Sequence, residues 1–106
     1  MSVYVDPLFQ VSEAAYHGPG ARQARRAGDR GGHRWCHLFG DVADSAELHT
    51  FAARLGMRRE WFDRDHYDLV PSRRALAVRL GAIEVDRARA VEIWDGYQRA
   101  RDGAAP

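Results

Sequence analysis

The sequence has no lysine, a single cysteine and no long apolar run. Because Cys36 has no second cysteine to pair with, an intrachain disulfide is excluded, as is typical of proteins from a reducing cytoplasm. No run approaches the roughly 18 apolar residues of a membrane-spanning helix. The N-terminus also lacks the basic and apolar regions of a secretory signal. We therefore expect a cytoplasmic protein with no membrane partner.

A surplus of positive charge is also missing, since the chain has 16 basic and 15 acidic side chains and a net charge of +1. This balance excludes the strong basic field of a protein that coats DNA. All 16 basic residues are arginine, which favours bidentate contacts with carboxylates and phosphates. The exclusion of lysine from a whole chain nevertheless indicates compositional bias more than chemistry.

The chain is long enough for one hydrophobic core, with 106 residues, 45% hydrophobic content and three tryptophans. We expect a single domain over residues 1–101 and a disordered tail at 102–106. Glycines and arginines crowd residues 10–33, which predicts a flexible loop. Arginines among glycines can also fold around a phosphate.

Hydrophobic periodicity and capping residues predict alternating strands and helices. The predicted strands are residues 2–5, 34–39, 66–70 and 82–85. The predicted helices are residues 44–55, 73–80 and 86–100. The last helix is expected to bury Ala90, Val91, Trp94 and Tyr97. Together they predict an α/β fold, a small mostly parallel sheet of about four short strands with three covering helices.

Five motifs follow one another along the chain. They are VYVD at 3–6, W-x-H-L at 35–38 followed by Asp41, A-E-L-H-x-F-A-x-R-L-G at 46–56, F-D-R-D-H-Y-D at 62–68, and R-x-x-A-x-x-x-G-A at 74–82. In this order they resemble DUF4031, an uncharacterised bacterial and phage family, over roughly positions 2–6 and 33–95. The resemblance supports the predicted fold and the importance of these five motifs. It implies no particular reaction. Residues 10–33 are longer than is usual for the family, so it gives their arginines no role.

Histidines and aspartates in the middle of the chain offer metal ligands. His37, Asp41, His49, His66 and Asp68 carry the imidazole and carboxylate groups that bind Zn²⁺, Mn²⁺ or Fe²⁺. We take His37, Asp41 and His66 as the candidate metal ligands. Their spacing matches no named metal motif, and hydrogen-bonded structural histidines explain the same residues.

Acid–base or phosphate chemistry is the second interpretation of this region. Histidine changes protonation near neutrality, with a pKa of ~6.5, and an adjacent carboxylate can fix its tautomer, for which Asp65, Asp68 and Asp41 are the candidates. Arg73 and Arg74 begin the next helix, where free N–H groups and guanidinium forks favour anions. We therefore expect His66 as the acid–base group, Asp68 as its orienter and Arg74 as an anion clamp. An ion pair between Asp68 and either arginine is the plainer alternative.

The remaining site residues come from the strand ends and the connector. Asp6 follows the first strand, so we expect it at the carboxyl edge of the sheet, where ligands gather; a turn cap with Pro7 is the plainer alternative. Trp61 is expected to fold over the core as a lid. The predicted catalytic residues are His66, Asp68 and His37, and the predicted ligand contacts are Asp6, Arg74, Arg73 and Trp61.

Two functions are therefore open. The first is an enzyme, with hydrolysis among its reaction classes, that acts on a phosphate-bearing ligand such as a nucleotide or nucleic acid and can be assisted by a metal. The second is a non-catalytic binding module whose contact surface is Trp61, Phe62 and the arginine-rich loop. Cysteine catalysis is disfavoured, because Cys36 and His37 alternate on a strand and point to opposite faces.

Overall fold

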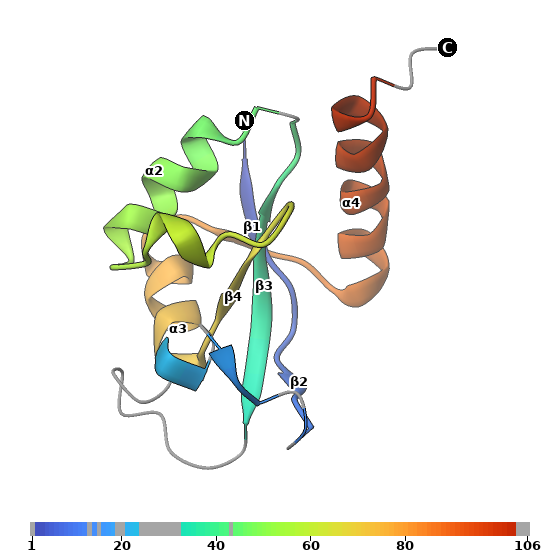
Figure 1. Ribbon diagram of the computed structural model, residues 1–106. Helices are drawn as coiled ribbons and strands as arrows, with labels where there is room; N and C mark the ends of the chain where they lie inside the picture. The colour runs from blue at the N-terminus through green and yellow to red at the C-terminus, as the bar shows by residue number, and fades with distance from the viewer. Residues whose placement is uncertain are drawn as a thin grey trace.

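Strand β3 (Arg34–Gly40) is the centre of the sheet in the computed structural model (Figure 1), which describes residues 2–12, 14, 16–18, 21–23, 33–42 and 44–103. Strands β1 (Val3–Val5) and β2 (Phe9–Gln10) pair with β3 one after the other, and β4 (Tyr67–Leu69) also pairs with it. The fifth strand, β5 (Ile83–Glu84), joins the sheet through β1.

The sheet is mixed, so the expectation of a mostly parallel sheet is wrong. β3 is antiparallel to β1, β2 and β4, and among the described strands β1 and β5 form the parallel pair. The physical reason is that periodicity identifies a strand but not its direction. The chain that follows β3 returns in such a way that β4 enters antiparallel, instead of completing a parallel crossover.

Helices cover both faces of the sheet. Helices α2 (Ala46–Arg54) and α3 (Pro71–Arg79) lie on one side, and α4 (Arg87–Arg101) stands alone on the other (Figure 1). A short 3₁₀ helix, η2 (Arg59–Trp61), continues the layer of α2. No helix in the described part of the chain has the length and apolar character needed to cross a bilayer.

Local signals set the helix ends much as the sequence indicates. The carboxylate of Asp44 accepts from the N–H of Ala46 at 3.0 Å, and that of Asp86 accepts from Arg89 at 2.8 Å. Pro71 begins α3, where its missing N–H costs no helical hydrogen bond. Gly56 adopts the left-handed conformation that ends α2, with φ of +77°.

The alternation of β3 separates two apolar clusters. Cys36 and Leu38 face α2 and α3 and belong to the main core, whereas Phe39 packs against Ala90 and Ile93 of α4. Val91 is 54% exposed, so its predicted burial is wrong. α4 packs through Ala90, Ile93 and Tyr97, and a residue directly after Ala90 is turned about 100° away from that stripe.

Part of the segment predicted to be a loose loop is held against the sheet by a buried side chain. Gln23 is buried; its side-chain amide donates to the carbonyl of Asp68 at 2.7 Å, and its side-chain oxygen accepts from the N–H of Val70 at 3.0 Å. These bonds satisfy backbone groups along β4. The predicted arginine-rich centre of the loop, residues 24–32, and the tail residues 104–106 lie outside the described residues.

Candidate functional site

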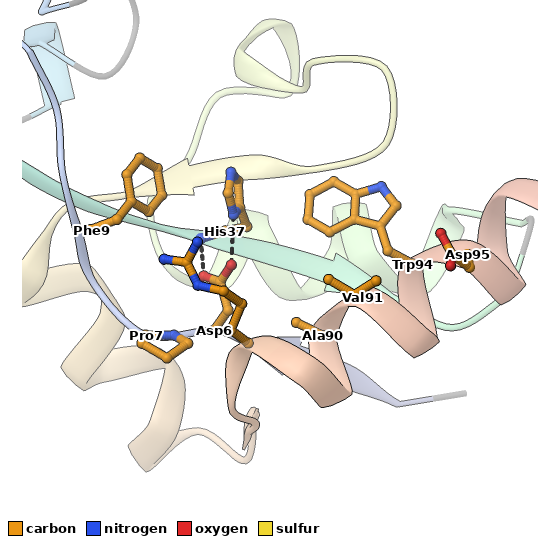
Figure 2. A pocket seen from close by; sticks show the side chains of 9 residues that line it. Asp6, Pro7, Phe9, His37, Ala90, Val91, Trp94 and Asp95 are labelled. Atoms are coloured by element: carbon orange, nitrogen blue, oxygen red, sulfur yellow. Dashed lines mark hydrogen bonds and ion pairs between the residues drawn. The ribbon is translucent and has the colours of Figure 1, made fainter.

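The site lies on the α4 side of the sheet, where His37 stands in the middle of β3. Asp6, directly after β1, accepts from the backbone N–H of His37 at 2.7 Å, and its other oxygen lies 2.7 Å from the ring Nδ1 of His37 (Figure 2). Because a carboxylate only accepts, Nδ1 carries the donated hydrogen. This arrangement fixes the ring and leaves Nε2 as the nitrogen for a ligand.

A second histidine is held in the same way. The Nδ1 of His66 lies 2.8 Å from the buried carboxylate of Asp65, and its Nε2 lies 3.3 Å from Asp68. Burial works to lower the pKa of His66, but hydrogen bonds and charge from Asp68 and Asp65 outweigh it and raise the pKa to about 9. The rings of His66 and His37 are 4.9 Å apart and nearly perpendicular.

Asp65 also connects the site to α4. Its second oxygen accepts from the indole N–H of Trp94 at 2.8 Å and from the side-chain amide of Gln98 at 2.7 Å. One buried carboxylate therefore orients His66 and anchors the helix that covers the site. Its hydrogen bonds offset the cost of its burial.

His37, His66 and Asp68 converge on one point. Each offers a ligand atom, and these atoms lie within 4.8 Å of one another. The convergence follows from the register, because His37 is paired directly with Asp68 across β3 and β4, and His66 precedes Asp68 by two residues on the same face. Ligand atoms of one tetrahedral Zn²⁺ lie roughly 3.3 Å apart, so the cluster needs to close by about 1.5 Å at most.

A cavity of about 500 Å³ opens beside His37. Its walls are mainly apolar and come from the chain after β1 and from the first half of α4 (Figure 2). The lining residues are Asp6, Pro7, Phe9, His37, Arg87, Ala90, Val91, Trp94 and Asp95. The guanidinium of Arg87 has no hydrogen-bond or ion-pair partner among the described residues.

Asp41, a predicted metal ligand, is not brought to this cluster. It lies four residues beyond His37, about 13 Å along an extended strand. Its two oxygens accept from the N–H of Ser2 at 3.2 Å and from the hydroxyl of Tyr4 at 3.1 Å. The predicted set of His37, Asp41 and His66 is therefore corrected to one in which Asp68 supplies the carboxylate.

Arg74, the predicted anion clamp, lies on the other face of the sheet. Its Nε donates to the backbone carbonyl of Asp6 at 2.9 Å and its Nη1 to Glu84 at 3.0 Å. The prediction that His66, Asp68 and Arg74 frame an anion is wrong, because α3 packs against the Cys36 face of β3 and His66 lies on the α4 face.

Arg73 and Trp61, the two other predicted ligand contacts, instead stabilise the fold. The Nε of Arg73 donates to the carbonyl of Leu55 at 2.9 Å and so closes the end of α2. Trp61 is 8% exposed and belongs to the main core, so its side chain packs against the core and does not line the cavity. In their place the structure puts Phe9, Trp94 and Arg87 at the cavity. The signal that singled out Arg73 and Arg74, arginine at a helix start, applies equally to Arg87.

Cys36 and His49 lie apart from the cluster. Burial, with the nearby charge of Asp6, raises the pKa of the Cys36 thiol to about 12. It therefore stays protonated and unreactive at neutral pH. His49 shares a hydrogen bond of 2.8 Å with the hydroxyl of Tyr67, which faces the main core.

A family model described as "Protein of unknown function (DUF4031)" matches residues 23–96, more than half of the chain. The chain belongs to the DUF4031 family. Searches among curated proteins and among solved structures find no match. The DUF4031 match includes His37, His66, Asp68 and Trp94, whereas Asp6 precedes it. Since the family's description assigns no activity, function has to be argued from the site.

Proposed function

We propose that this DUF4031 protein is a small metal-dependent enzyme that acts on a phosphate-bearing ligand. His37, His66 and Asp68 would hold the divalent cation. The observation that carries the proposal is their convergence within 4.8 Å, with each imidazole oriented through Nδ1 by a further carboxylate. Carboxylate–histidine–metal arrangements of this kind fix the ring and strengthen the nitrogen as a ligand.

Two histidines and one carboxylate suit Zn²⁺, Mn²⁺ or Fe²⁺ and leave coordination positions open for water and substrate. A cation there makes bound water more acidic and polarises a phosphoryl oxygen. The protein's own part is orientation: Asp6 keeps Nε2 of His37 directed to the cluster, and Asp65 does the same for His66.

Arg87 supports phosphate as the ligand group. It lines the cavity beside His37 and has no ion-pair partner among the described residues, and guanidinium binds phosphate oxygens through paired N–H groups. In hydrolysis a P–O bond forms from water, the bond to the leaving oxygen breaks, and the proton of the water passes to that oxygen. Phe9 and Trp94 line the cavity next to His37.

The non-catalytic binding module has less support. It requires Trp61 and Phe62 at the surface, yet Trp61 is buried in the main core. The arginine-rich half of its contact surface lies outside the described residues.

The test is a calorimetric titration of chelator-treated protein with Zn²⁺, Mn²⁺ and Fe²⁺. We expect about one ion per chain, and His37→Ala and Asp68→Ala should weaken binding by more than tenfold, while Asp6→Asn weakens it about tenfold. His49→Ala is the matched control, because that histidine is half-buried and hydrogen-bonded but lies outside the cluster.

Phosphatase activity on a chromogenic phosphate ester should follow the same order in these variants. Failure of the wild-type protein to bind any of the three ions would remove the proposal. Equal affinity in wild type, His37→Ala and Asp68→Ala would show that the ion binds elsewhere.

A further inference from the structure

We infer that the cavity beside His37 binds a nucleoside monophosphate. Its phosphate would lie between Arg87 and His37, and its base would lie against the ring of Trp94. The inference rests on the proposed function and names its ligand. It follows from the size of the cavity, from the chemistry of its walls and from the position of its charged groups.

The cavity suits a compact ligand. Its volume of about 500 Å³ lies within the roughly 300–1,000 Å³ usual for small-molecule sites. The covering helix α4 and the chain after β1 bound it on two sides (Figure 2). These limits favour one nucleotide over an extended polymer.

The walls suit a flat ring. Pro7, Phe9, Ala90, Val91 and Trp94 supply an apolar surface, two of them aromatic. Stacking of a base on an aromatic side chain is worth roughly 1–3 kcal/mol in nucleic-acid complexes, so an aromatic wall distinguishes a nucleoside from a bare phosphate.

Trp94 is held ready for such a contact. Its indole N–H donates to Asp65 at 2.8 Å, and its ring stacks on Phe39 with centroids 5.0 Å apart. Because the ring is already ordered, binding loses little side-chain entropy.

Three charged side chains line the cavity: Arg87 and Asp95 from α4, and Asp6, whose carboxylate is bonded to the ring of His37. Arg87 and Asp95 are eight residues apart on α4, or about 12 Å along the helix axis, and both line the cavity. A nucleoside monophosphate carries an anion at one end and N–H or O–H donors at the other. Arg87 matches the first and Asp95 the second.

His37 joins the cavity to the metal cluster, since it belongs to both. A phosphate held by Arg87 would therefore lie next to the proposed cation. This placement puts the group to be hydrolysed, rather than the base, at the reactive end.

The experiment measures binding of adenosine monophosphate, adenosine and inorganic phosphate to the full chain by calorimetry, with Mn²⁺ present and after chelation. We expect adenosine monophosphate to bind more than tenfold tighter than adenosine or inorganic phosphate alone. Arg87→Gln should weaken the monophosphate and phosphate by about 10- to 100-fold, as expected for a lost charge-assisted contact, and leave adenosine unchanged.

Two variants control for indirect effects. Arg89→Gln removes an arginine from the same helix that pairs with Glu92 at 2.9 Å and does not line the cavity, so it should bind like wild type. Val91→Trp fills the cavity from an exposed position and should abolish nucleotide binding while Mn²⁺ binding persists.

The outcomes separate the two proposals. Mn²⁺ binding without preference for the monophosphate, or equal losses in Arg87→Gln and Arg89→Gln, overturns the inference and leaves the metal site. Nucleotide binding that depends on Arg87 without any metal binding supports the inference and overturns the proposed metal-dependent chemistry.

Discussion

At the scale of single residues, three carboxylates assign different roles to two histidines. Asp6 uses both oxygens on His37, whose side chain is 28% exposed and lines the cavity. Asp65 and Asp68 enclose His66, which is 16% exposed, from both ring nitrogens. Of the two proposed metal ligands, His37 therefore also lines the cavity, whereas His66 has a carboxylate at each ring nitrogen.

The raised pKa of His66 predicts a pH dependence of stability for metal-free protein. In the folded state the pKa is about 9, against 6.5 for the free side chain. The folded state holds its proton more tightly, so the stabilisation is complete below about pH 6.5 and is lost as pH rises through about 9. The difference corresponds to a free energy on the order of 3 kcal/mol.

Urea unfolding in the presence of a chelator at pH 6.5 and pH 9.5 measures this difference. His66→Gln should remove most of the pH dependence, because glutamine does not titrate. If wild type and His66→Gln lose the same stability over this range, then another group is responsible.

At the scale of elements, the edge of β4 depends on a residue far away in sequence. Gln23 forms two hydrogen bonds with backbone groups of Asp68 and Val70, and its side chain is only 1% exposed. Because Asp68 lies in the proposed cluster, the same contact helps to hold the site in place.

Gln23→Ala should therefore destabilise the protein by about 1–3 kcal/mol, since it leaves a buried N–H and a buried carbonyl without their partner. The lower urea midpoint should be accompanied by weaker metal binding. The neighbouring variant Arg22→Ala, at an exposed position, should leave both quantities unchanged. A Gln23→Ala protein as stable as Arg22→Ala would mean that β4 does not need this contact.

At the scale of the whole molecule, the site exists only when separate parts of the chain meet. Its groups come from the end of β1, the middle of β3, the start of β4 and the helix α4. An unfolded chain does not bring these ligands together, so a bound cation must favour the folded state.

Thermal unfolding should accordingly shift with metal concentration. At a free ion concentration 100 times Kd the expected stabilisation is about 2.7 kcal/mol, which is about 10 °C in Tm for a domain of this size. His37→Ala should lose the shift and His49→Ala should keep it. A shift of equal size in both variants would place the ion outside the proposed cluster.

The sequence by itself determined the elements and most of their ends. Alternation placed β1, β3, β4 and β5. Asp44, Pro71, Asp86 and Gly56 marked helix ends, because each of these signals depends on neighbouring residues. It also drew attention to Asp6, His37, His66 and Asp68, since ionisable side chains next to apolar strands are chemically conspicuous.

Only the tertiary structure decided which of these groups meet. The antiparallel register pairs His37 with Asp68 and carries Asp41 away, and register is set by contacts between distant segments. The choice between arginines was likewise not local: Arg74 lies in the first turn of α3 and Arg87 begins α4, but α3 packs on the Cys36 face and α4 on the His37 face. Which face a helix covers depends on the direction in which the chain crosses the sheet, and periodicity carries no information about that direction.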